Sequence, residues 1–135
     1  MSSPRGSLPS RRCSEDRLLG TVYLYRTANH GIDNANSPIM VHALRPRVVV
    51  MDNQVGHGGS VEVFRTVESS PGLEDFWQSH DSPAGGEKAN VSPDYIANME
   101  ATPGGKWIKV SVERDGTFTV ANTRNNFSKT YKPRK

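Results

Sequence analysis

Four histidines are the side chains in this 135-residue chain best suited to bind a metal ion or to move a proton: His30, His42, His57 and His80. The intervals between them are 12, 15 and 23 residues, too long for the paired histidines of a helical zinc motif. A metal site would therefore have to be assembled by the fold from separate loops. The sequence contains no GxSxG elbow, Walker-type loop or GxGxxG motif, so it marks no nucleophile and no nucleotide site. Its single cysteine, Cys13, excludes an internal disulfide.

His30 is the first candidate among the four, because it stands beside a glycine just past the apolar segment 21–25. Catalytic and binding groups of α/β proteins collect where strands end. His57 lies in the glycine-rich loop GHGG and is either merely exposed or functional. His80 ends a predicted strand and has the same two alternatives, whereas His42 falls inside a predicted helix and is better interpreted as a packed or surface residue.

Apolar patterning predicts the elements that position these side chains. Segment 21–25, TVYLY, is typical of a strand, and segment 47–51, RVVVM, of a strand covered on both faces. Between them, Ser37 and a following proline favour a short helix over residues 38–44. This order of strand, helix and strand predicts that the two strands lie parallel in one sheet.

The second half of the chain alternates turns with short elements. The expected elements are a helix capped by Ser60, a strand over 73–80, one or two helical turns over 93–99, and a hairpin over 106–120 that turns at Asp115-Gly116. The packed face of the hairpin is expected to contain Trp107 or Ile108 together with Val110, Val112, Phe118 and Val120. The neighbouring acids Glu74 and Asp75 are expected to be solvated.

The charge of the chain is concentrated at its ends. The formal net charge is +3, yet residues 18–123 carry eight basic and twelve acidic side chains. We therefore expect residues 1–20 to form a disordered basic leader and residues 132–135 a basic tail, and we expect no specific nucleic-acid partner. No apolar run reaches the roughly 18 residues of a membrane span, so we expect no membrane partner and, by default, a cytoplasmic location.

One stretch of the chain resembles a known family. Its motifs are Asn29-His30-Gly31, Asn36-Ser37-Pro38, Leu44-Arg45-Pro46 and the apolar run from Val48 to Asn53. This stretch is similar to the later part of metallo-β-lactamase-fold hydrolases, in the competence-protein (ComEC)-like branch. The similarity continues through PDYIAN and the predicted hairpin, and it covers roughly residues 21–131.

The resemblance implies an α/β fold: the C-terminal half of a metallo-β-lactamase-type αββα sandwich with a terminal β-hairpin. Such hydrolases hold one or two metal ions, commonly zinc, with His and Asp side chains at one sheet edge. The metal turns bound water into a hydroxide that attacks an ester, amide or phosphodiester. By position His30 matches a histidine at that metal centre, and His57 is a second candidate ligand.

The sequence also departs from the family. The principal metal motif, HxHxDH, is absent, Tyr23 replaces an acid and residues 54–57 replace a glycine-led basic loop. We therefore expect a C-terminal fragment of a metallohydrolase that is inactive and binds no zinc stably by itself, and whose leader is foreign to the fold. An uncovered apolar sheet face would lead it to bind the missing N-terminal half or to self-associate. The alternatives are a hydrolase subunit completed by another chain and a non-catalytic interaction module with a basic tail.

Overall fold

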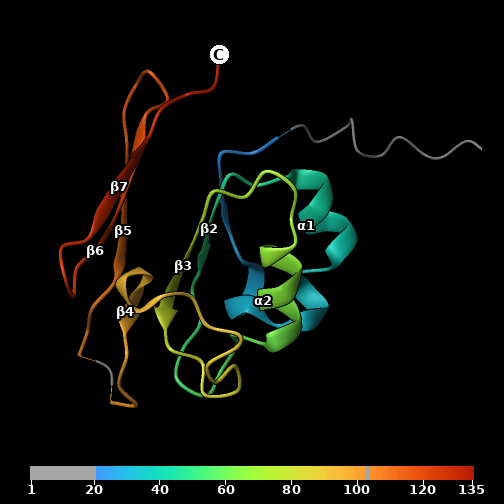
Figure 1. Cartoon of the computed structure of the whole chain (residues 1–135), viewed down its shortest axis with the longest axis vertical. Helices are drawn as coiled ribbons and strands as arrows, with labels where there is room; N and C mark the ends of the chain where they lie inside the picture. Colours follow the sequence, from blue (N-terminus) through green and yellow to red (C-terminus); the bar gives the residue numbers. More distant parts are fainter. Residues whose placement is uncertain (1–20, 103) are drawn as a thin grey trace, which may run out of the picture.

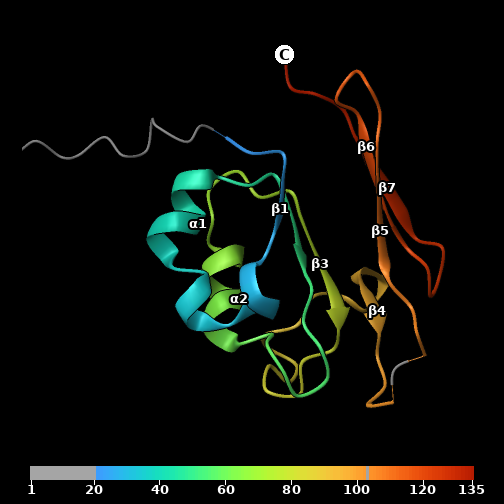
Figure 2. The same cartoon turned by 180° about the vertical axis from the view of Figure 1, so that it is seen from behind.

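Two helices and two sheets form three layers in the computed structural model, which describes residues 21–102 and 104–135. Figures 1 and 2 show the helices on one side of the central sheet and the second sheet on the other. The α/β class and the terminal hairpin are thus confirmed. The predictions made for the leader and for Cys13 lie outside the described residues. Within those residues, no helix has the length and apolar character that crossing a bilayer requires.

The central sheet is parallel, with the strand order β1-β2-β3-β4. The second sheet is antiparallel, with the order β5-β6-β7. The strands and helices are β1 (Leu24–Arg26), α1 (Pro38–Leu44), β2 (Val48–Met51), α2 (Val61–Glu68), β3 (Asp75–His80), β4 (Ile96–Asn98), β5 (Ile108–Val112), β6 (Phe118–Asn122) and β7 (Ser128–Tyr131).

Both helices begin at the predicted serine caps. The Ser37 side chain accepts a hydrogen bond from the backbone N–H of Met40, and the Ser60 side chain accepts one from Val63. These bonds satisfy N–H groups that the first turn of a helix leaves without partners. α1 then ends at Arg45, which adopts a left-handed conformation with φ of 47°.

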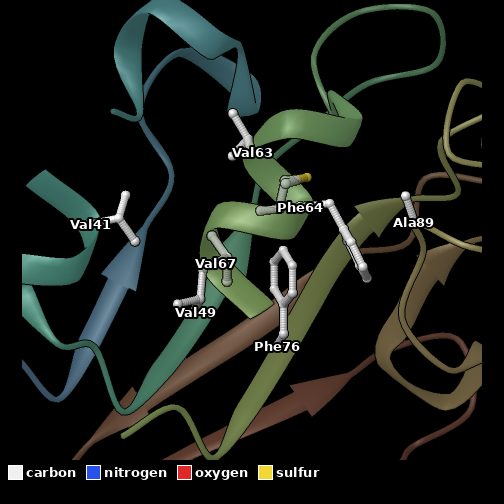
Figure 3. Packing of buried hydrophobic residues seen from close by; sticks show 8 residues of the cluster. Val41, Val49, Val63, Phe64, Val67, Phe76 and Ala89 are labelled. Carbon is white, nitrogen blue, oxygen red and sulfur yellow. The ribbon is translucent and has the colours of Figure 1, made fainter. Parts of the chain in front are cut away.

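The two faces of the parallel sheet are both covered. Val49 and Met51 of β2 face α1 and α2, and Figure 3 shows Val49 and Phe76 beneath the helical side chains. Val48 and Trp77 point the other way, into a second apolar cluster with Phe118, Val120 and Tyr131 of the antiparallel sheet. The expectation of an uncovered apolar sheet face was therefore wrong, because β5, β6 and β7 cover it.

Two elements differ from those predicted. The helical turns expected over 93–99 are confined to a 3₁₀ turn at Pro93–Tyr95, and the next three residues form β4 instead. β4 pairs with β3, with Gln78 opposite Ile96 and His80 opposite Asn98, because its buried side chains complete the sheet. Strand β7 was not predicted at all. In the hairpin, Val112 is 70% exposed rather than packed, since it lies at the end of an edge strand.

Asp75 is buried rather than solvated, in contradiction to the expectation for the acid pair. Its carboxylate accepts hydrogen bonds from the Tyr95 hydroxyl at 3.0 Å, the Lys129 ammonium at 2.7 Å and the Tyr131 hydroxyl at 2.7 Å. The side chain lies between the two sheets, where three donors from other elements replace water. Its neighbour Glu74 remains at the surface.

The C-terminal tail lies against the body of the protein. The Arg134 guanidinium forms an ion pair of 2.6 Å with Glu74, which is also 2.7 Å from Arg47. Both arginines lower the pKa of Glu74 through hydrogen bonds to its carboxylate. Arg47 also donates a hydrogen bond to the carbonyl of Lys132.

Candidate functional site

The carboxyl ends of β1 and β2 bring together the side chains that could do chemistry. The two strands are parallel, so the residues that follow them lie at the same edge of the sheet. His30 follows β1, and its Nδ1 lies 2.9 Å from the backbone carbonyl of Asp52, which follows β2. The Asp52 carboxylate in turn accepts hydrogen bonds from Arg26 at 2.9 Å and from Thr27 at 3.3 Å.

The loop that holds His30 has an unusual backbone. Asn29, His30 and Gly31 have φ of 46°, 58° and 75°. All three values lie in the left-handed region, which residues other than glycine rarely adopt. Three consecutive residues of this kind reverse the chain tightly at the strand end. Such a conformation persists only where the surrounding structure fixes it.

Asn36 is one part of that surrounding structure. This buried side chain accepts hydrogen bonds from the backbone N–H of Ala28 at 2.9 Å and from the Tyr25 hydroxyl at 2.8 Å. Its amide group donates to the carbonyls of Ala28 and Ile32, each at 2.8 Å. All of its oxygen and nitrogen bonds thus stabilise the chain reversal around His30.

The glycine loop between β2 and α2 closes against the His30 loop. The N–H of Gly59 donates to the carbonyl of His30 at 2.9 Å, and the N–H of Ser60 donates to that of Gly31 at 3.1 Å. This contact brings the His57 ring to the His30 ring, with centroids 5.1 Å apart in an edge-on arrangement. The two candidate metal ligands of the sequence therefore lie side by side.

Gly58 permits this close approach, and its replacement tests it. A Cβ at Gly58 would lie 1.9 Å from the His30 carbonyl oxygen, whereas a Cβ at Gly56 would meet nothing within 4 Å. Both glycines have positive φ, 73° at Gly58 and 69° at Gly56, so an alanine would cause similar backbone strain at either position. We expect Gly56→Ala to cost about 1 kcal/mol and Gly58→Ala to cost more than about 2 kcal/mol.

Urea unfolding of the two glycine variants measures this difference. We also expect Gly58→Ala to shift the NMR signals of the His30 ring, because the loop that carries His57 must move. Equal costs for the two variants would show that the loops do not touch in this way.

The hydrogen bond to Asp52 defines which nitrogen of His30 is available. A carbonyl oxygen only accepts, so Nδ1 of the neutral ring carries the hydrogen and Nε2 carries the lone pair. The ring is half-buried, with 32% of its side-chain surface exposed. A histidine oriented through one nitrogen by a backbone carbonyl is the usual arrangement of a metal ligand. His30 therefore fits a metal ion at Nε2.

The donor set is nevertheless incomplete. Within residues 21–102 and 104–135, no three His, Cys, Asp or Glu side chains are grouped so that they could hold a metal ion. The Asp52 carboxylate is 3.7 Å from Nδ1 of His30 and is held by Arg26. His80 also ends a strand at this edge, but it is not grouped with the other two histidines, so His30 and His57 are the pair of nitrogen ligands that the two loops offer.

The other two histidines, His42 and His80, lie apart from this pair. Nε2 of His42 contacts the carbonyl of Thr66 at 3.0 Å and the hydroxyl of Ser69 at 3.2 Å, so it links α1 to α2 as a packed residue. His80 ends β3, where its backbone N–H donates to Asn53. Its Nδ1 is buried without a partner among the described atoms, and burial lowers the pKa of the ring.

Sequence reasoning found His30 and His57 but missed Asp52 and Asn36. Asp52 directly follows a predicted strand, so the rule that selected His30 could also have selected it. Asn36 gives no comparable indication, because its hydrogen bonds reach residues four, eight and eleven positions away, and no local sequence pattern marks such partners.

Comparisons of the chain with models of protein families, with curated proteins and with solved structures found no match.

Proposed function

We propose that this chain is the C-terminal part of a metal-dependent hydrolase of the metallo-β-lactamase fold. In this proposal His30 and His57 supply two ligands of a metal centre, zinc being the expected ion. The remaining ligands come from an N-terminal segment of the same domain or from another chain. Bound zinc would activate water for attack on an ester, amide or phosphodiester.

The observation that carries the proposal is the pairing of His30 and His57 at the carboxyl edge of the parallel sheet. The rings come from two loops, 27 positions apart in sequence, and their centroids are 5.1 Å apart. Three consecutive left-handed residues and a glycine contact are needed to place them there. Strain of this kind concentrates at functional sites, and it persists only where the rest of the fold offsets its cost.

The hydrogen bonds around the pair support a role in ligation. Nδ1 of His30 is committed to the Asp52 carbonyl, and Asp52 is itself fixed by Arg26 and Thr27. This second layer of contacts orients the imidazole before a ligand arrives, so little entropy is lost on binding. Asp52, Arg26 and Thr27 thus fix the orientation of the His30 ring and leave its Nε2 available as a nitrogen donor.

Zinc titration followed by calorimetry tests the proposal. Because two imidazoles are fewer than the three or four protein ligands of ordinary zinc sites, we expect one weakly bound zinc ion per chain. Binding should be lost in His30→Asn and in His57→Ala. Asparagine is chosen at position 30 because it tolerates the left-handed backbone there.

His42→Gln is the matched control, since it removes a histidine that packs between the helices and should leave zinc binding unchanged. We also expect the isolated chain with zinc to hydrolyse nitrophenyl esters and phosphodiesters no faster than free zinc does. Zinc binding that survives both His30→Asn and His57→Ala would contradict the proposed site, and rapid turnover by the isolated chain would contradict its incompleteness.

A further inference from the structure

Strand β5 forms an open edge of the antiparallel sheet. The strand order is β5-β6-β7, so β5 pairs only with β6. With five residues it is longer than β1, the first strand of the parallel sheet, which has three. A free edge of this length presents unpaired backbone groups that can accept another strand.

The hydrogen bonds to β6 define which residues of β5 face outward. The N–H of Thr123 donates to the carbonyl of Trp107, and the N–H of Glu113 donates to that of Thr117. In an antiparallel pair the backbone groups of alternate residues point to the same neighbour. The odd-numbered residues of β5 therefore bond to β6, and Ile108, Val110 and Val112 point their N–H and C=O groups to the open edge.

The side chains of the same three residues form an apolar strip that begins at the core and ends exposed to solvent. Val110 lies opposite Val120, and Val112 lies opposite Phe118, both of which are buried. Cross-strand partners share a face, so the side chains of all three β5 residues are on the core side of the sheet. Ile108 and Val110 are only partly buried against the core, however, and Val112 is 70% exposed.

We propose that the β5 edge binds the β5 edge of a second copy of this chain, forming a symmetric dimer with a continuous six-stranded antiparallel sheet. The two strands would pair about a two-fold axis at Ser111. Val110 then faces Val112 of the second copy, and symmetry repeats this contact. Both residues point their backbone groups outward, so the two contacts form about four backbone hydrogen bonds between the copies.

Two side chains of opposite charge, Lys109 on β5 and Glu113 directly after it, can pair between the two copies in this register. Lys109 and Glu113 are exposed on the outer face of the strand, and neither forms an ion pair within residues 21–102 and 104–135. About the same axis, Lys109 lies directly opposite Glu113 of the second copy, within reach of its carboxylate. Symmetry produces this attraction twice. A parallel pairing would instead place like charges together.

This inference is independent of the metal chemistry proposed above, because it concerns a different sheet and requires no metal. Sedimentation velocity of the full chain over a series of concentrations, with chelator present, tests it. We expect the unmodified chain to be a dimer whose dissociation constant rises about tenfold or more in Lys109→Glu and in Glu113→Lys. The double variant, with the charges exchanged, should restore the dimer.

Val112→Lys tests the apolar contact, because it should weaken the dimer while sparing the monomer fold. Ile39→Lys, at an equally accessible apolar position on α1, is the control and should leave the dimer intact. Circular dichroism checks that each variant is folded. A chain that is monomeric throughout, or a dimer that is indifferent to Val112→Lys and to the charge reversals, would overturn the proposal whatever the outcome of zinc titration.

Discussion

Replacing Trp77 by alanine is expected to cost about 3 to 5 kcal/mol of unfolding free energy, a large part of the 5 to 15 kcal/mol of an ordinary domain. Trp77 is fully buried between the two sheets. Its ring packs against Tyr95 and Phe127, with centroids 4.6 and 5.6 Å away, and its Nε1 donates to the Tyr131 hydroxyl. Alanine would leave a cavity where the parallel and antiparallel sheets meet.

The second tryptophan of the chain supplies the control. Trp107 is 59% exposed, just before β5, and we expect Trp107→Ala to cost less than about 0.5 kcal/mol. Urea unfolding followed by far-ultraviolet circular dichroism measures both variants against the unmodified chain. Similar costs for the two tryptophans would show that the sheets do not pack through Trp77.

Asp75→Ala is expected to cost about 2 to 4 kcal/mol, because it removes the acceptor of three buried or half-buried donors. Asp75 binds the Lys129 ammonium and the hydroxyls of Tyr95 and Tyr131. The hydrogen bond to Asp75 raises the pKa of Lys129, and burial together with the same carboxylate raises the pKa of both tyrosines. Without Asp75 the hydroxyls of Tyr95 and Tyr131 lose their acceptor between the sheets, whereas the Lys129 side chain, which is 40% exposed, can still reach water.

Glu74→Ala is the matched control one residue away. Glu74 pairs with Arg47 and Arg134 at the surface, where ion pairs contribute little, so we expect a cost below about 1 kcal/mol. Thermal unfolding of the two alanine variants at neutral pH separates the cases. Equal destabilisation would mean that Asp75 is as solvated as the alternating strand pattern alone implied.

Local rules predicted the elements whose own residues determine them. α1 and α2 begin where a serine can accept a backbone hydrogen bond, and the hairpin turns at Asp115-Gly116, as expected from those residues alone. The apolar run of β2 likewise predicted a strand buried on both faces. In these cases the sequence and the tertiary environment favour the same local structure.

The remaining elements depend on contacts that the sequence does not display. β7, with the sequence SKTY, has little apolar patterning and becomes a strand because it pairs with β6. β4 is three residues long and is stabilised as a strand by β3. Asp75 is buried because donors more than 50 positions away in sequence reach it from β7. No local pattern predicts such partners.

The candidate site was predictable in the same partial way. His30 follows from the rule that functional groups gather at strand ends. Its proximity to His57 required the left-handed turn at Asn29 and the close contact at Gly58, neither of which residue type alone reveals.

Histidine-selective NMR during zinc titration tests the central claim most directly, because it reports each ring separately. We expect zinc to shift the ring signals of His30 and His57 together. Nε2 of His30 should be the perturbed nitrogen, while Nδ1 keeps the hydrogen that it donates to the Asp52 carbonyl. The signals of His42 and His80 should remain unchanged. Zinc that shifts neither His30 nor His57, or that shifts one without the other, would contradict a shared metal site at this sheet edge.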